Sequence, residues 1–113
     1  MKPAARRFFR AVVLCTSLGA NLAALAHNDG AAKKTAEGTC AGCHGSMGNK
    51  PTVPGVPRLA GQQYEYLRQA LAAYHNGSRQ NPMMSAIAQP LEPSEIDDLA
   101  WYYSRQRGLT SKY

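Results

Sequence analysis

A single C-x-x-C-H motif, formed by Cys40, Cys43 and His44, constrains this chain more than any other feature. Its spacing is typical of the covalent attachment of a c-type haem. Two thiols three positions apart can each add to one vinyl group of the same porphyrin, and the histidine that follows can place its imidazole beneath the iron. A C-x-x-C pair alone would fit redox and zinc sites as well, and His44 is what favours haem. The motif therefore predicts one haem c, bound through two thioethers.

The first 26 residues have the pattern of an export signal. Basic residues cluster within the first ten positions, and residues 11–25 form an apolar run without a charged side chain. An A-x-A cleavage site ends at Ala26, so the mature chain is predicted to begin at His27. The alternative, a retained membrane anchor, needs about 20 apolar residues, more than this run provides. We expect a cleaved signal peptide at 1–26 and one exported domain at 27–113, without stable membrane insertion.

Charge and cysteine content narrow the classes of function. The full chain carries a net charge of +6, but four of its 13 lysines and arginines lie in the signal, which leaves the mature domain near +2. We therefore expect no nucleic-acid binding. Cys15 leaves with the signal, so the exported domain has no cysteines outside the motif for a disulfide framework. A domain of this length is near the size at which small folds need a cross-link or a bound group for stability, and the covalent haem would supply it.

Helices are expected on both sides of the motif. Asn28 or Asp29 can cap a helix that runs toward Cys40. A second helix is predicted from about position 62 to His75, because apolar residues recur at helical spacing and a glycine stop follows. Its stripe consists of Tyr64, Leu67, Leu71 and Tyr74. His75 lies in the last turn, where an imidazole suits the helix dipole, and that role is favoured over iron ligation.

The segment between these helices, residues 45–61, is predicted to be a loop. It holds three prolines and several glycines, which exclude a regular element. A stiff segment of this kind can wrap an edge of a haem. A metal-bound histidine usually donates its second ring nitrogen to an acceptor, and we expect a backbone carbonyl near Pro51 or Pro54 to accept from His44. The sequence does not select between these carbonyls.

The C-terminal third is predicted to hold a short turn and the last helix. Residues 81–88 indicate a turn followed by one helical turn. The last helix is expected to begin with Ser94 as its cap, with Asp97 three residues later as in a capping box, and to hold Arg105 and Arg107 in its last turn. Its apolar stripe consists of Ile96, Leu99, Ala100 and Tyr103. No strand pattern is present, so the predicted fold class is all-α, with three main helices and long loops around one covalent haem.

Together with the motif, short segments along the rest of the predicted mature chain match a known family, and they occur in the same order as in that family. They are Cys40–Gly45, Pro57–Gln62, Tyr66, Leu67, Tyr74, Gly77, Arg79, Met83, Met84, Leu91 and Asp97–Tyr103. With these residues the chain resembles a class I c-type cytochrome, in particular the small mono-haem cytochromes c-553 of bacteria and the halves of the di-haem cytochromes c-four. The resemblance implies three main helices around a haem, His–Met axial ligation of the iron, and one-electron transfer in the bacterial periplasm.

The resemblance also implies which side chain is the sixth iron ligand. Met83 and Met84 are adjacent, and neighbouring side chains of a helix point about 100° apart, so only one of them can face the iron. In the family this ligand lies seven residues before the leucine that precedes the last helix. Here that leucine is Leu91, which gives Met84. The predicted metal ligands are therefore His44 and Met84, with Met83 and His75 as alternatives.

The predicted function is that of an electron carrier without a substrate reaction of its own, because filled axial positions keep substrates from the metal. One alternative is an electron-transfer subunit of a larger oxidoreductase. Another is a haem sensor or enzyme with an open site, in which Met84 does not bind the iron. A third is a zinc site without haem, completed by His75 or His27. We expect a monomer whose partners are redox proteins, and the sequence does not identify the donor or the acceptor.

Overall fold

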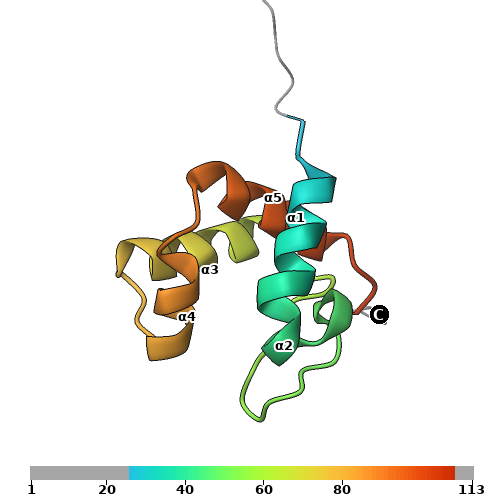
Figure 1. Ribbon diagram of the computed structural model, residues 1–113, viewed down its shortest axis with the longest axis horizontal. Helices are drawn as coiled ribbons and strands as arrows, with labels where there is room; N and C mark the ends of the chain where they lie inside the picture. The colour runs from blue at the N-terminus through green and yellow to red at the C-terminus, as the bar shows by residue number, and fades with distance from the viewer. Residues whose placement is uncertain (1–25, 109–113) are drawn as a thin grey trace, which may run out of the picture.

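The computed structural model describes residues 26–108, so nearly all of the predicted signal peptide lies outside the described residues. Within this range the chain is helical and contains no strand, which confirms the all-α prediction. The elements are α1 (Asp29–Thr35), a π-helical turn (Ala36–Cys40), α2 (Ala41–His44), a 3-10 turn (Ser46–Gly48), α3 (Tyr64–Asn76), α4 (Pro82–Ala88) and α5 (Pro93–Ser104) (Figure 1). Over these described residues, no helix combines the length and the apolar character needed to cross a bilayer.

The helix α1, the π-helical turn and α2 follow one another without a break and carry the C-x-x-C-H motif at their C-terminal end. The Asn28 side chain accepts a hydrogen bond from the Ala31 N–H at 3.0 Å, which confirms the predicted cap. The helical segment continues past Cys40 and ends at His44, where Gly45 adopts a φ of 84°. The thiols and the imidazole are thus presented from one continuous helical segment.

The helices α3 and α4 are consecutive and pack against each other. α3 ends before Gly77, whose left-handed φ of 81° supplies the predicted stop. α4 makes about two turns rather than the single turn expected. The reason is a cap that the sequence analysis did not assign: the Asn81 side chain accepts hydrogen bonds from the N–H groups of Met83 and Met84, both at 3.0 Å.

The last helix starts at a different residue from the one predicted. α5 begins at Pro93, and its capping box pairs Glu92 with Glu95, whose carboxylate accepts from the Glu92 N–H at 2.9 Å. Proline fits the first helical position because that position needs no N–H donor. The predicted capping box of Ser94 and Asp97 is therefore wrong. Asp97 lies one turn inside the helix, where its carboxylate is free to contact other elements.

The C-terminal end of α5 also differs from the prediction. The helix ends at Ser104, so Arg105 and Arg107 lie beyond it rather than in its last turn. Arg105 instead forms an ion pair with Asp29 at 2.6 Å and lies over the ring of Trp101. The end of α5 is in this way connected to the start of α1.

The core of the molecule forms around α5, which packs against both α1 and α3 (Figure 1). The apolar stripe predicted for this helix is confirmed, since its four side chains are buried and Leu99 is only 1% exposed. Five of the eleven buried apolar residues in the described chain are alanines, so the core contains few large side chains. A peptide core this small buries little apolar surface by itself.

Candidate haem site

The two motif thiols lie on consecutive helical elements. Cys40 ends the π-helical turn, and Cys43 lies within α2. Both are half-buried free thiols. Burial raises the pKa of the Cys40 thiol, and a hydrogen bond with the Tyr103 side chain offsets part of that rise. Tyr103 belongs to α5, so this contact joins the motif to the central helix of the core.

The imidazole of His44 is buried, with 6% of the residue exposed, and a hydrogen bond holds its orientation. The Nδ1–H donates to the carbonyl oxygen of Pro57 at 2.8 Å. The acceptor predicted near Pro51 or Pro54 is therefore wrong, because the loop places its third proline against the ring. Since Nδ1 is occupied, Nε2 is the ring nitrogen available to a metal.

A single threonine anchors the loop that brings Pro57 to His44. The hydroxyl of Thr52 donates to the carbonyl oxygen of Gly42 at 2.6 Å, and its backbone N–H donates to that of Cys43 at 3.0 Å. Both carbonyls belong to the last turn of α2, where the helix leaves them without partners of its own. The loop is thus fastened directly to the motif.

Two glycines allow the loop to approach the motif closely. A Cβ at Gly45 would lie 1.9 Å from the carbonyl oxygen of Lys50. At Gly48, where φ is 72°, a Cβ would lie 2.7 Å from the ring of Tyr103. Only glycine avoids both the collision and the strain of a positive φ. The prediction of an irregular segment at 45–61 holds apart from one 3-10 turn, which follows Gly45 and ends at Gly48.

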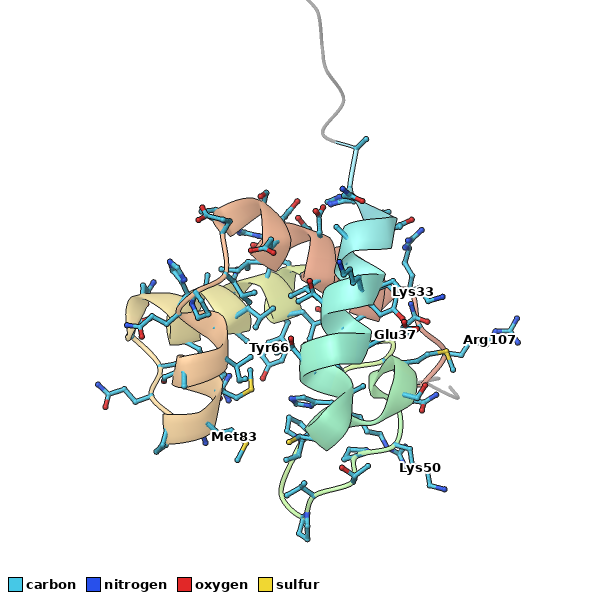
Figure 2. The ribbon with its side chains drawn as sticks, viewed as in Figure 1. Lys33, Glu37, Lys50, Tyr66, Met83 and Arg107 are labelled. Carbon is cyan, nitrogen blue, oxygen red and sulfur yellow. The ribbon has the colours of Figure 1, made fainter. Side chains whose placement is uncertain are left out.

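The two candidate methionines lie in the first turn of α4 but differ in exposure. Met83 is 57% exposed, whereas Met84 is half-buried. The Asn81 cap fixes the backbone of this turn, and adjacent side chains of a helix then point in different directions. Figure 2 shows Met83 at the N-terminal end of α4, on the side toward α2 in this view, and Tyr66 of α3 between α4 and the segment of α1 and α2.

The two remaining histidines of the described chain make contacts of their own. The Nδ1–H of His75 donates to the carbonyl oxygen of Ala88 at 3.0 Å and so joins α3 to α4. The ring of His27 stacks on Trp101, with 4.5 Å between the ring centroids. A zinc site would require one of these imidazoles to lie close to the two thiols and His44. Within residues 26–108, neither imidazole does so.

The surroundings of the motif fit an apolar prosthetic group. Large apolar side chains are exposed on the loop, α3 and α4: Met47, Val53, Tyr66 and Met83. A haem attached at Cys40 and Cys43 would cover apolar surface of this kind and add the volume that the alanine-rich core lacks. Two thiols for the thioether bonds and an imidazole whose Nδ1 is already fixed are the groups with which a protein attaches a c-type haem and binds its iron.

Comparison with known proteins agrees with this geometry. The family model of cytochrome c matches residues 30–104, a range that contains the motif, both methionines and α5. The chain belongs to the cytochrome c family. This membership confirms the resemblance to c-type cytochromes and the predicted cofactor: the family carries covalently bound haem c, and Cys40, Cys43 and His44 fit its C-x-x-C-H motif.

Three relatives of this cytochrome differ in how much of their length is shared. Cytochrome c-554(548) of Halomonas halodenitrificans is 40% identical over 81 residues, which cover 69% of this chain and 96% of the relative. Cytochrome c4 of Stutzerimonas stutzeri is 34% identical over 106 residues, 86% of this chain and 50% of the relative. A thiosulfate dehydrogenase electron acceptor of Thiomonas intermedia is 40% identical over 67 residues, 59% of this chain and 31% of the relative. The chain thus spans half or less of the last two.

Sequence reasoning missed three residues that shape the site. Asn81 had a recognisable signal, because an asparagine directly before a proline is typical of a helix cap followed by the first helical residue. Pro57 and Thr52 had no such signal, since their contacts with the motif depend on the path of the whole loop. The contact of Tyr103 with Cys40 was likewise not predicted, although Tyr103 was placed correctly in the core.

Proposed function

We propose that this cytochrome is a mono-haem electron carrier, with thioether bonds at Cys40 and Cys43 and with His44 and Met84 as axial iron ligands. The observation that carries the proposal is the state of the His44 imidazole. The ring is buried, it belongs to the motif, and its Nδ1–H is fixed on Pro57 at 2.8 Å. This arrangement holds the ring in one tautomer and leaves Nε2 to the iron.

Met84 is proposed as the sulfur ligand in preference to Met83. Its half-buried position supports this choice, because Met83 beside it is mostly exposed. The count from Leu91 supports Met84 too. Leu91 is the leucine that precedes the last helix, and it is buried just before α5 begins. Asn81 contributes by fixing the turn that carries both methionines.

The residues of the chain set the conditions for electron transfer. When bound, the haem supplies an iron that gains and loses one electron between its ferrous and ferric states. The Pro57 carbonyl fixes the ring of His44 and makes its imidazole a stronger electron donor. The thioether of Met84 acts in the opposite direction and favours the reduced state. With both ligands in place substrates are excluded, so we propose no substrate reaction for this protein.

The proposal includes export to the bacterial periplasm and cleavage after Ala26, which leaves the haem domain at 27–113. The basic, apolar and A-x-A pattern of residues 1–26 supports it. The near-neutral charge of the remaining domain suits a freely diffusing monomer with modest electrostatic steering toward its redox partners.

One finding favours a second candidate function, that of electron acceptor for a particular dehydrogenase. The relative from Thiomonas intermedia is named as the electron acceptor of thiosulfate dehydrogenase. To test this role, the oxidised cytochrome is mixed with periplasmic extract of its source, with and without thiosulfate, and reduction is followed in the visible spectrum. Reduction that depends on thiosulfate supports the second candidate, and equal rates in both mixtures contradict it.

The spectrum and the intact mass of the periplasmic protein test the main proposal together. We expect a mass equal to residues 27–113 plus one haem, a low-spin spectrum in both oxidation states, and no carbon monoxide binding to the reduced protein. Ready binding of carbon monoxide would mean that the sixth position is open and that the protein is a sensor or an enzyme. A haem-free protein that contains zinc would contradict the proposal altogether.

A further inference from the structure

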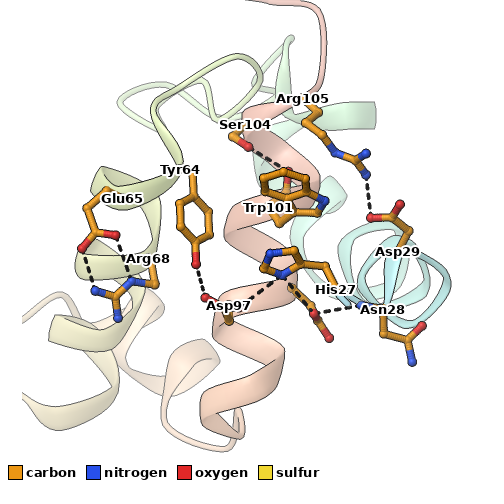
Figure 3. Close-up of polar contacts among 11 residues, drawn as sticks. His27, Asn28, Asp29, Tyr64, Glu65, Arg68, Asp97, Trp101, Ser104 and Arg105 are labelled. Atoms are coloured by element: carbon orange, nitrogen blue, oxygen red, sulfur yellow. Dashed lines mark hydrogen bonds and ion pairs between the residues drawn. The ribbon is translucent and has the colours of Figure 1, made fainter. Parts of the chain in front are cut away.

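Three potential metal ligands converge at a place that the haem site does not use. His27 lies just before α1, and its ring points toward Asp97 of α5 (Figure 3). Asp98, the next residue of α5, is the third member of the group. The His27 Nδ1 is 3.2 Å from one carboxylate oxygen of Asp97 and 3.6 Å from one of Asp98. Within residues 26–108, no other three His, Cys, Asp or Glu side chains have ligand atoms that all lie within 4.8 Å of one another.

These separations are those expected around a metal ion. A tetrahedral zinc ion with bonds of about 2.0–2.1 Å to nitrogen and oxygen keeps its ligand atoms roughly 3.3 Å apart. The two distances from the imidazole nitrogen, 3.2 and 3.6 Å, lie on either side of this value. Imidazole nitrogen and carboxylate oxygen are also both ligand types that zinc and related divalent cations bind.

Each of the three side chains is held in place by a neighbour outside the group. The hydroxyl of Tyr64 donates to the carboxylate of Asp97, and this hydrogen bond raises the pKa of Tyr64. The backbone N–H of Asn28 donates to the carboxylate of Asp98 at 2.9 Å. The ring of His27 stacks on Trp101 at an interplanar angle of 15° (Figure 3). Outer contacts of this kind orient the ligands of metal sites.

The group is also open to solvent. It borders a hollow of about 540 Å³ between the residues that precede α1, one face of α3 and the first turns of α5. Arg68 lines the same hollow, but its guanidinium is paired with Glu65 at 2.6 Å. The hollow does not include Cys40, Cys43 or His44, so an ion could enter without disturbing the haem.

We propose that His27, Asp97 and Asp98 bind one divalent cation of the zinc class, independently of the haem. The ion would lie between the imidazole nitrogen and the two carboxylates, and water would complete its coordination. Because His27 precedes α1 whereas both carboxylates belong to α5, the bound ion would link the first described residues to the central helix of the core. Binding is expected to stabilise the folded haem protein.

The test is a calorimetric titration of the chelator-treated haem protein with zinc chloride. We expect one saturable site in the wild-type protein, with affinity reduced by more than about tenfold in His27→Gln and in Asp98→Asn. His75→Gln is the matched control, because His75 borders the same hollow while its Nδ1–H is bonded to Ala88, and it should bind zinc like the wild type. The visible spectrum shows that each variant retains its haem and fold.

Two further measurements separate a metal site from an ion pair. Tyr64→Phe removes the partner that orients Asp97 and should weaken zinc binding by about tenfold. Saturating zinc should raise the melting temperature of the wild-type protein but not that of His27→Gln. Absence of a saturable site, or equal weakening in His27→Gln and His75→Gln, would overturn the proposal and leave the group as an ion pair. Neither outcome affects the haem spectrum, so the proposed electron-carrier function is tested separately.

Discussion

The two sides of the proposed haem site are held in different ways. On the side of His44, hydrogen bonds tie the imidazole and the motif carbonyls to the loop. On the side of Met84, α4 is held by the Asn81 cap at its start and by the bond from His75 to Ala88 at its end. The first side is fixed at the ligand itself, and the second only at the two ends of the helix that carries the ligand.

The chemistry of the two side chains explains this difference. An imidazole has a second nitrogen that a protein acceptor can hold, whereas a thioether has no hydrogen-bond donor. The polypeptide can therefore position Met84 only indirectly, through the backbone of α4. We expect the polypeptide to fix the position of His44, and the bond between sulfur and iron to fix much of the position of Met84.

Removing the covalent attachment should break both sides at once and have the largest effect. The Cys40→Ala/Cys43→Ala variant can form no thioether, and the alanine-rich core should be too small to keep the helices folded. We expect a largely unfolded chain by circular dichroism and no haem absorbance in the purified protein. Either single variant should keep at most one thioether. A cooperative thermal transition in the haem-free double variant would show that the peptide core suffices.

The substitution Gly45→Ala tests the His44 side. Its Cβ would collide with the carbonyl oxygen of Lys50, so we expect the free energy of unfolding to fall by more than about 3 kcal/mol. The control is Gly55→Ala, where φ is 80° and nothing lies within 4 Å of the added Cβ, so the loss should be only about 1–2 kcal/mol. Denaturant titration of the haem proteins compares the two. Equal losses would mean that the close approach of the loop contributes nothing.

The Met84 side is tested by comparing Met84→Ala with Met83→Ala. The first should abolish the near-infrared charge-transfer band from sulfur to ferric iron, admit external ligands and lower the reduction potential. We expect it to reduce stability by about 2 kcal/mol, with the haem still attached. Met83→Ala should keep the band, because Met83 is mostly exposed. Loss of the band in Met83→Ala alone would mean that Met83, and not Met84, is the iron ligand.

A smaller effect is expected from the cap of α4. Asn81→Ala removes the acceptor for the N–H groups of Met83 and Met84 and should cost about 1 kcal/mol of unfolding free energy. Asn81→Ser keeps an acceptor and should restore most of the loss. The same two variants should differ in how readily the reduced protein binds carbon monoxide, because a frayed turn would release the sulfur more often. Identical ligand binding would show that the iron alone orients α4.

The smallest effect is expected at Arg107, just beyond the end of α5. Its side chain is exposed, and its contact with Asn49 uses the backbone carbonyl, which survives substitution. Arg107→Ala should therefore change the free energy of unfolding by less than about 0.5 kcal/mol. A larger loss in the same denaturant titration would indicate an interaction of the guanidinium that the structure does not contain.

By itself the sequence determined the features that depend on local chemistry. The spacing of Cys40, Cys43 and His44 determined the cofactor, because thioether attachment needs thiols at that separation. The spacing of apolar residues determined that α5 is a helix and which face it buries, with Leu99 at the centre. The pair Asn28 and Asp29 located the start of α1 to within one residue, because a cap acts on N–H groups only a few residues away. Each of these signals operates within a few turns of chain.

The tertiary structure decided which distant groups meet. The acceptor for His44 is Pro57 because Thr52 and the two glycines set the path of the loop, and no local pattern distinguishes its three prolines. The cap of α5 is Glu92 and not the predicted Ser94, so the carboxylate of Asp97 contacts Tyr64 and His27. Such contacts join residues that lie far apart in the chain, so they depend on the packing of whole helices rather than on any local preference.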